Sequence, residues 1–348
     1  YDTGGLLTST TRNDGSTVAF SYDGLGRMTA SSSEGRLETY SYDACVNGLG
    51  RLCSTAHARG GNSMSYTREG QIASHLDRIV LVSSEHLNMR QYAYDSLGRI
   101  SEILYADGAV AKYAYNGVGQ PYSLNIRIGD HTFPVISATA YLADGARGQL
   151  VYGNSLARAY HFDTSARLAA MSVQKLDNSV VSRTQFSYSS DNEITRINDD
   201  VDPSMTQSIG YDALSRLTSV NRFGVLNQLG YDAGGNHDWY RAGTALTQYS
   251  IDPGSNRVSG YTSPSGNRAY QYDALGNRIS ETIGGSTSTW TYSPFNRMEQ
   301  SNIGGLVTDY LVNPLGQRVG KHNAAQASYY YYIGQNQLLA ELTGSTWT

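Results

Sequence analysis

The dipeptide Tyr-Asp recurs along the chain at a near-constant interval, and this repetition limits the possible folds more than any other feature. The intact copies begin at Tyr1, Tyr22, Tyr42, Tyr94, Tyr211, Tyr231 and Tyr272. Degenerate copies fill the gaps, at Tyr115, Phe162, Tyr188, Ile251 and Tyr292, with a further variant from Tyr310. Neighbouring copies often lie about 20 residues apart, the length of two strands and two turns. The period therefore predicts a tandem array of one small β unit.

The fullest copies predict that this unit is a β-hairpin. Residues Tyr22–Arg27 read YDGLGR, and residues Tyr94–Arg99 read YDSLGR. An Asp side chain accepts a backbone hydrogen bond and opens a turn, Gly supplies the positive φ that closes it, and Arg begins the return strand opposite the Asp. We expect a loop of four or five residues with an exposed Asp-Arg pair, which contributes about 0 to 1 kcal/mol. The predicted structural positions are Tyr22, Asp23, Gly26, Arg27, Tyr94, Asp95, Gly98, Arg99, Tyr211, Asp212, Arg216, Tyr272, Asp273, Gly276 and Arg278.

The composition favours a thin sheet over a globular core. Tyrosine (28) and glycine (37) are abundant, and charged residues make up only 16% of the chain. Large aliphatic residues are sparse, so we expect one semi-polar sheet layer with no second layer packed on it, held in register by ladders of Tyr across the strands. Among the 26 basic residues only Lys112, Lys175 and Lys321 are lysines. Arginine stacks on aromatic rings and pairs with carboxylates, so we expect Arg and Tyr to be partners.

No constellation of residues predicts an enzyme, a cofactor or a metal site. The seven histidines are scattered, and the sequence has no nucleophile elbow and no phosphate-binding loop. The acidic run at 198–202 departs from the spacing of calcium loops, so a solvated turn is expected there. A net charge of -4 without a basic run argues against nucleic acid as a partner. No stretch is apolar enough for a membrane span, and there is no signal peptide.

One local oddity is His237-Asp238-Trp239, which stands where the Gly-Arg of a turn is expected. Trp239 and Trp290 forming a sugar-stacking patch is one interpretation, and ordinary strand packing is the one we favour. The cysteines leave two further alternatives open. Cys45 and Cys53 bracket a short Gly-containing insertion, which a disulfide would close with a contribution of about 2.5 kcal/mol in the chain-entropy model. Two free thiols in a reducing compartment fit the sequence equally well.

The repeat motifs resemble a known family. Residues Tyr272–Arg278 (YDALGNR), Tyr211–Leu217 (YDALSRL) and Asn313–Arg318 (NPLGQR) are similar to the YD repeats of rearrangement-hotspot (Rhs) proteins. Those repeats resemble in turn the repeats of toxin-complex B/C components, cell-wall-associated proteins and teneurins. The cysteine insertion at 42–53 and the stretch at 142–154 also look like Rhs elements. The resemblance covers 1–342, with degenerate repeats at 56–91 and 123–140, and we treat 1–348 as a single repeat array and a fragment of a longer chain.

This resemblance implies an all-β fold of tandem antiparallel hairpins, forming a curved strip that spirals into a hollow shell. In bacterial members the shell encloses a C-terminal toxin, which an aspartyl autoprotease of the core cuts free. The chain stops near Leu342, before such a core segment is expected, so neither autoprotease nor toxin is assigned to it. The expected partners are the remainder of the same shell and the enclosed toxin, with secretion-apparatus or carbohydrate partners also compatible. The implied location is secreted or cell-surface delivered in bacteria, with the delivery signal outside this segment.

Two functions follow as hypotheses. The first is a non-catalytic structural shell segment that carries a toxin polypeptide, and it rests on the family resemblance rather than on the fold alone. The second is an adhesin-like module that binds carbohydrate or protein through exposed Tyr and Trp. An adhesin should present a localised aromatic patch, whereas the inner wall of a shell need not bind tightly.

Overall fold

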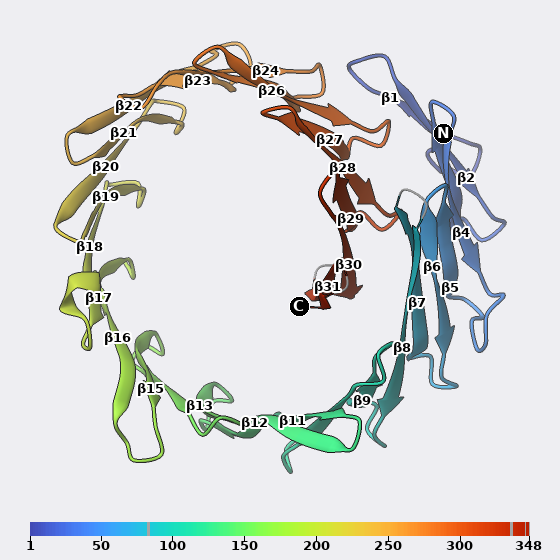
Figure 1. Cartoon of the computed structure of the whole chain (residues 1–348), viewed down its shortest axis with the longest axis horizontal. Helices are drawn as coiled ribbons and strands as arrows, with labels where there is room; N and C mark the ends of the chain where they lie inside the picture. Colours follow the sequence, from blue (N-terminus) through green and yellow to red (C-terminus); the bar gives the residue numbers. More distant parts are fainter. Residues whose placement is uncertain (82–83, 335–336, 345, 348) are drawn as a thin grey trace. The chain divides into compact units, whose positions relative to one another are not determined.

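The protein is all-β, as the sequence predicts. The computed structural model describes residues 1–348 except 82–83, 335–336, 345 and 348, and these described residues form 32 strands and one short 3-10 turn at Pro203–Met205 (Figure 1). The chain divides into two compact units. The first consists of two stretches, Tyr1–Asp107 and Ala269–Thr348, and the second is Gly108–Arg268.

The first unit contains both ends of the array. The strands of its N-terminal stretch are β1 (Ser9–Thr11), β2 (Thr17–Tyr22), β3 (Met28–Ser33), β4 (Arg36–Tyr42), β5 (Leu52–His57), β6 (Gly60–Tyr66), β7 (Ile72–Leu81), β8 (Ser84–Tyr94) and β9 (Ile100–Leu104). Those of its C-terminal stretch are β25 (Arg278–Ile283), β26 (Ser286–Tyr292), β27 (Met298–Ile303), β28 (Leu306–Val312), β29 (Arg318–Asn323), β30 (Ala327–Ile333), β31 (Gln337–Thr343) and β32 (Thr346–Trp347). Within each stretch, every strand pairs antiparallel with the next one in the chain.

The second unit follows the same rule. Its strands are β10 (Val110–Tyr115), β11 (Pro121–Ile128), β12 (His131–Tyr141), β13 (Arg147–Tyr152), β14 (Ala157–Phe162), β15 (Leu168–Gln174), β16 (Val180–Tyr188), β17 (Ile194–Asp199), β18 (Gln207–Tyr211), β19 (Leu217–Arg222), β20 (Val225–Tyr231), β21 (His237–Ala242), β22 (Ala245–Ile251) and β23 (Val258–Thr262), and β24 (Arg268–Tyr272) begins at its last residue. Consecutive strands from β10 to β23 pair antiparallel. Few side chains of this unit are buried, as expected for a sheet that has no second layer packed on it.

Because consecutive strands are antiparallel, alternate turns lie at opposite edges of the strip. The turns that follow a repeat tyrosine, such as 23–27 after β2 and 293–297 after β26, form what we call the Tyr-Asp edge. The intervening turns, such as 34–35 before β4 and 304–305 before β28, form what we call the glycine edge. Each stretch of the array therefore has two chemically different edges.

The repeat tyrosines also mark irregularities in pairing. The register shifts between Ser21 and Tyr22 where β2 pairs with β3, and the same shift precedes Tyr42, Tyr94 and Tyr292. A shift of this kind places one extra residue on one strand, which bends the strand and raises its twist. The repeat thus contains a built-in source of curvature at the Tyr-Asp edge.

The expectation of a single layer throughout is wrong in the first unit. Strand β7 of the N-terminal stretch contacts β29 and β30 of the C-terminal stretch, although it pairs only with β6 and β8 (Figure 1). The side chains between these strands form the main buried hydrophobic cluster. Two segments far apart in the sequence therefore pack face to face here, and we call this contact the seam.

Candidate functional site

The repeat turn has the hydrogen bonds that its sequence predicts. Oδ1 of Asp23 accepts the backbone N–H groups of Leu25 (2.9 Å) and Arg27 (3.0 Å), and Oδ2 accepts Nε–H of Arg27 at 2.7 Å. Gly26 has a φ of 75° and donates its N–H to the Asp23 carbonyl oxygen at 3.0 Å. The loop between β2 and β3 is the five residues 23–27. The side-chain hydrogen bonds of Arg27 hold the pKa of the Asp23 carboxyl below its usual value.

The same arginine also links one repeat to the next. The guanidinium of Arg27 lies 4.5 Å from the ring centroid of Tyr42 and donates from Nη2 to Oδ2 of Asp43 at 2.6 Å. The hydroxyl of Tyr42 donates to the backbone carbonyl oxygen of Met28 at 3.0 Å. One arginine is therefore held by its own Asp and by the Tyr-Asp pair of the following hairpin. The predicted partnership of Arg and Tyr exists, and it connects neighbouring repeats.

Both links recur along the array. Tyr hydroxyls donate to the backbone carbonyl at the start of an earlier return strand, in the pairs Tyr94–Ile72, Tyr188–Leu168, Tyr211–Ile194, Tyr231–Leu217, Tyr292–Arg278 and Tyr332–Arg318. Turn arginines stack on the next tyrosine ring in the pairs Arg51–Tyr66, Arg167–Tyr188 and Arg216–Tyr231. The Asp-Arg pair recurs as Asp95–Arg99, Asp163–Arg167 and Asp212–Arg216. These contacts recur from hairpin to hairpin.

Two positions of the repeat differ from the sequence interpretation. In the copy that begins at Tyr272, Asn277 takes the place of the turn arginine, because its Nδ2–H donates to Oδ2 of Asp273 at 2.9 Å. Arg278 starts the next strand and lies over the Trp290 ring, with 4.4 Å to its centroid. In the copy that begins at Tyr211, Ser215 takes the left-handed position of glycine with a φ of 59°. The turn thus tolerates other residues at both sites.

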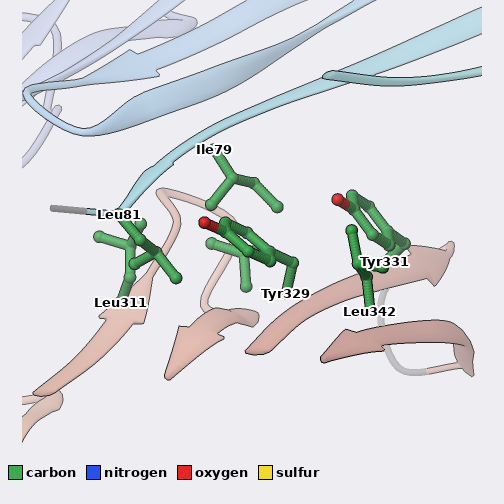
Figure 2. Packing of buried hydrophobic residues seen from close by; sticks show 7 residues of the cluster. Ile79, Leu81, Leu311, Tyr329, Tyr331 and Leu342 are labelled. Carbon is green, nitrogen blue, oxygen red and sulfur yellow. The ribbon is translucent and has the colours of Figure 1, made fainter. Parts of the chain in front are cut away.

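The seam is the second candidate site, and its centre is apolar. Ile79 and Leu81 of β7 face Leu311 of β28, Tyr329 and Tyr331 of β30 and Leu342 of β31 (Figure 2). Tyr331 is 1% exposed and Ile79 is 2% exposed. Burial on this scale contributes about 1.5 to 3 kcal/mol per large side chain. The cluster therefore holds the two stretches of the first unit together.

Close approach of the two layers depends on a glycine. A Cβ at Gly320 of β29 would lie 2.8 Å from Cδ2 of Leu81, closer than carbon atoms can approach without movement. Beside this contact, the rings of His86 and Tyr329 pack with their centroids 3.8 Å apart. The absence of a side chain at Gly320 thus lets β7 pack directly on β29.

The rim of the seam is polar, and it brings the Tyr-Asp edge of the C-terminal stretch onto the N-terminal strands. The backbone oxygen of Pro314, in the turn 313–317, accepts a hydrogen bond from the Tyr40 hydroxyl at 3.2 Å. The backbone oxygen of Pro294, in the turn 293–297, accepts one from Nη1 of Arg12. Side chains of the N-terminal stretch therefore donate hydrogen bonds to the turn tips of the C-terminal stretch.

An ion pair at this rim follows from one departure in the repeat. In the turn 293–297, Ser293 replaces the usual Asp, and its hydroxyl still accepts the backbone N–H groups of Phe295 and Arg297 at 3.2 Å. A serine hydroxyl lacks the negative charge of the usual carboxylate, and Arg297 pairs instead with Glu38 of β4, 259 residues away. The Glu38 side chain is 5% exposed and that of Arg297 is 24% exposed. The repeat arginine has been redirected from its own turn to the seam.

A cavity of about 550 Å³ lies at the same rim. Its lining includes Leu37 of β4, His57 at the end of β5, Arg59 in the next turn, and Phe295 and Arg297 of the docked turn. Burial, together with the positive charges of Arg297 and Arg59, lowers the pKa of His57 to about 4. His57 is therefore neutral at physiological pH.

A buried charge network lies under the apolar cluster. Nη2 of Arg90, whose side chain is fully buried, donates to Oδ2 of Asp77 at 2.6 Å, and Nε2 of His75 lies 3.0 Å from Oδ1 of Asp77. Burial acts to raise the pKa of Asp77, but the hydrogen bond and charge of His75 and the charge of Arg90 keep it below its usual value. Burial also raises the pKa of Tyr331, with the Asp77 charge acting in the same direction. The pairing with Asp77 offsets part of the cost of burying the Arg90 charge.

The cysteines, the tryptophans and the acidic run considered in the sequence analysis all take part in contacts that stabilise the fold. Cys45 and Cys53 are joined in a disulfide that closes the insertion between β4 and β5. Trp290 is buried under Arg278, and the Trp239 ring occupies the space where a side chain at Gly230 would lie. The acidic run at 198–202 is a turn in which Asp199, Asp200 and Asp202 accept hydrogen bonds from neighbouring groups. Trp239 and Trp290 are therefore packed against residues of their own or the neighbouring strand.

Among the residues that the structure describes, no group of three or more His, Cys, Asp or Glu side chains is placed to hold a metal ion. Over the same residues, no helix is long and apolar enough to cross a membrane.

Sequence reasoning did not find the seam, although two signals in the chain mark it. The first is Ser293, where the repeat Asp is missing while its Arg remains. The second is the run Ser328–Tyr331 in β30, all four residues of which are buried. A strand with one wet face should alternate, so a continuous buried run indicates cover on both faces. Both signals are departures from the repeat.

Comparisons with known proteins define the class of this fold. The crystal structure of TcdB2-TccC3 without its hypervariable C-terminal region aligns with a TM-score of 0.71 at 13% identity, over 99% of this chain and 23% of that chain. The Photorhabdus luminescens Tc holotoxin pore aligns with a TM-score of 0.69 at 15% identity, over 96% of this chain and 20% of that one. The fold is therefore that of the β-hairpin strip found in these toxin-complex proteins.

Sequence comparison names the repeat. The family model "RHS Repeat" matches residues 1–37. The toxin protein Tse5 of Pseudomonas aeruginosa is 29% identical over 176 residues, which cover 44% of this chain and 13% of Tse5. These matches confirm the YD-repeat, or Rhs, character that the sequence motifs resemble. The chain spans about a quarter or less of the length of each of these relatives.

Proposed function

We propose that this chain is a structural wall segment of an Rhs-type shell that encapsulates and carries a C-terminal toxin polypeptide. The observation that carries the proposal is the seam, where two stretches of one hairpin array pack on each other although all of Gly108–Arg268 lies between them in sequence. A strip that packs face to face on an earlier part of itself covers apolar side chains of both stretches. Such a strip is suited to enclosing a volume.

The repeat supplies the other mechanical property that a wall needs. Many hairpins are tied to a neighbour by a Tyr hydroxyl, an Arg–Tyr stack or both, and the register shift that recurs at the repeat tyrosines bends the strand. Contacts between neighbours alone allow an array to extend without a central core. We propose that this array curves around a hollow interior.

The relatives support an enclosed C-terminal toxin polypeptide, the passenger, as the partner of this chain. Tse5 is named a toxin protein, and one solved relative is described by the removal of a hypervariable C-terminal region. A wall that precedes an exchangeable C-terminal region fits a carrier role. The proposed partners of this chain are thus the remainder of its shell and the enclosed toxin, and its proposed location is secreted or cell-surface delivered in bacteria.

The role is proposed to be structural and non-catalytic. Several turn carboxylates and arginines along the array pair with each other, as in Asp23–Arg27 and Asp95–Arg99, so they serve the hairpins. A screen of the purified segment against peptide, glycan and nucleic-acid substrates tests this. Turnover that survives repurification and disappears on one point mutation would contradict it.

Encapsulation is tested in the full-length protein that contains this segment. The enclosed polypeptide should resist protease in the wild type and become sensitive in Arg297→Glu, which places two carboxylates at the rim of the seam. The charge-swapped double variant, Glu38→Arg with Arg297→Glu, should recover protection. Digestion of the passenger at the rate of the free polypeptide in the wild type would reject encapsulation.

The hollow geometry is tested on the segment alone by small-angle scattering, with circular dichroism to confirm β structure. A compact domain of this length would have a radius of gyration of roughly 20 Å. A curved strip must exceed that value while folded. A folded monomer at about 20 Å would exclude the shell geometry.

A further inference from the structure

We propose that the cavity at the rim of the seam is a binding site for a small carboxylate with an apolar body, such as a short fatty acid. The cavity has a volume of about 550 Å³, and cavities of about 300 to 1,000 Å³ are the size that holds small molecules. Its walls are β4 and β5 of the N-terminal stretch, and the turn 293–297 with β27 and β28 of the C-terminal stretch. A molecule bound there would contact both stretches at once.

Both carboxylates of the lining are already neutralised. Two guanidinium nitrogens of Arg297 donate to the two carboxylate oxygens of Glu38. Arg36 holds Glu299 in the same two-point manner. Each of these pairs is internally balanced, so neither pair leaves a charge for a ligand to meet.

The third arginine of the lining has no such partner. Arg59 lies in the turn between β5 and β6, and among the residues that the structure describes no carboxylate is paired with its guanidinium. Its backbone is nevertheless fixed, because its carbonyl oxygen accepts the N–H of Val80 at 2.9 Å. The cavity therefore contains one part-buried cation whose charge is left to attract an anion.

His57 adds a neutral hydrogen-bond donor beside this cation. Its Nδ1 accepts the backbone N–H of Arg59 at 3.4 Å, so the neutral ring carries its proton on Nε2. Burial and the charges of Arg297 and Arg59 lower the pKa of His57 to about 4, which keeps the ring neutral at pH 7. One cation with one neutral donor suits a single negative charge, and it repels a cationic ligand.

The remaining walls favour an apolar body behind that charge. Leu37, Ala56, Phe295 and Leu311 line the cavity, and Leu37 is 54% exposed. Covering such surface with hydrocarbon is favourable, whereas a small hydrophilic anion would leave it in water. The charge selects the carboxylate and the apolar walls select what is attached to it.

Titration calorimetry of the folded chain at pH 7 tests this with four probes that separate charge from body. Octanoate carries both features, octanol only the body, acetate only the charge, and octylammonium the opposite charge. Octanoate has about ten non-hydrogen atoms, so we expect a dissociation constant of roughly 1 mM or below. Octanol and acetate should each bind at least roughly tenfold more weakly, and octylammonium should give no saturable heat.

Variants of two lining residues locate the site. Arg59→Gln should weaken octanoate binding roughly tenfold and leave octanol binding unchanged, so that the preference for the charged probe disappears. Ala56→Phe fills the cavity from β5 and should abolish binding of both probes. Arg68→Gln is the matched control, because Arg68 is an exposed arginine of the turn 67–71 outside the lining, and it should bind like the wild type. Circular dichroism checks that each variant is folded.

Three results would overturn the proposal. The first is octanoate that gives no saturable heat up to roughly 10 mM, about ten times the expected dissociation constant. The second is acetate or octanol that binds as tightly as octanoate. The third is octanoate binding that is unchanged in Arg59→Gln or in Ala56→Phe. Protease protection of the passenger does not enter these measurements, so the shell function is judged separately.

Discussion

The ion pair between Glu38 and Arg297 gives the sharpest test of the seam, because its two partners are buried to different extents. The Glu38 side chain is 5% exposed, whereas that of Arg297 is 24% exposed. Arg297→Ala leaves a carboxylate in a site that water scarcely reaches, whereas Glu38→Ala leaves a guanidinium that can be hydrated. We therefore expect the two truncations to cost different amounts of stability, although they remove the same contact.

The magnitudes follow from this asymmetry. Removing one partner of a fully buried pair costs about 3 to 5 kcal/mol. Glu38 borders the seam cavity, which admits some hydration, so Arg297→Ala should lower the free energy of unfolding by about 2 to 4 kcal/mol. Glu38→Ala should cost about 1 to 2 kcal/mol. The double-mutant cycle should give a coupling energy of about 1 to 3 kcal/mol.

Urea unfolding, with hydrogen exchange of β4 and β27 to locate the effect, measures these quantities. Arg99→Ala is the matched control, because Arg99 pairs with Asp95 inside its own turn, where both side chains stay part-exposed and can be hydrated, and it should cost about 1 kcal/mol. Ser293→Asp provides a second variant that removes no side chain. It restores the carboxylate that holds the arginine in other turns, so it should weaken protection of β4 without unfolding the hairpin. Equal costs for the two truncations together with a coupling energy near zero would refute this account.

Three further predictions concern the repeat and the insertion. Gly26→Val should lower the free energy of unfolding by about 1 kcal/mol or more, because φ is positive there, whereas Gly24→Val, at a position without positive φ, should cost less; equal urea midpoints would show that the hairpin register is wrong. Peptide mapping without reductant should recover Cys45 and Cys53 as one linked species after oxidative expression, and two free thiols would contradict the bond. The hydrogen bonds of Arg27 lower the pKa of Asp43 from 3.8 to about 2. The stability that this pair contributes should therefore be complete above pH 4 and be lost as the pH falls towards 2. If the urea midpoint of Asp43→Asn depends on acid in the same way as that of the wild type, this prediction is refuted.

The seam should also respond to acid through His57. Its pKa in the folded chain is about 4, below the ordinary value of 6.5, so the unfolded chain binds a proton in this range and the folded chain does not. The contribution of His57 to the free energy of unfolding is therefore complete above pH 6.5. It falls by about 1 to 3 kcal/mol as the pH drops to about 4. His57→Gln should flatten the pH dependence of stability between these limits. An unchanged slope would mean that His57 is hydrated in the folded chain.

The hairpin was predictable from sequence because everything it needs is local. Asp23, Gly26 and Arg27 lie within one turn. Their hydrogen bonds depend only on the backbone geometry of that turn. The link from Arg27 to Tyr42 was foreseen only as a partnership of residue types, since sequence spacing does not say which strand faces which. The seam was not foreseen, because the cluster joins Ile79 of β7 to Tyr331 of β30, and no local pattern in the sequence tells which distant strands pack on each other.

Departures from the repeat carry the information that the repeat itself cannot. A tandem array with identical units has identical surfaces, so its sequence could not specify which stretch packs on which. Two departures mark the seam here: Ser293 leaves Arg297 without a carboxylate in its own turn, and Gly320 leaves space for Leu81 of β7. The first gains an ionic partner, and the second a packing contact, only across the seam. Positions that break the consensus without loosening the turn are therefore where contacts between windings should be sought in arrays of this kind.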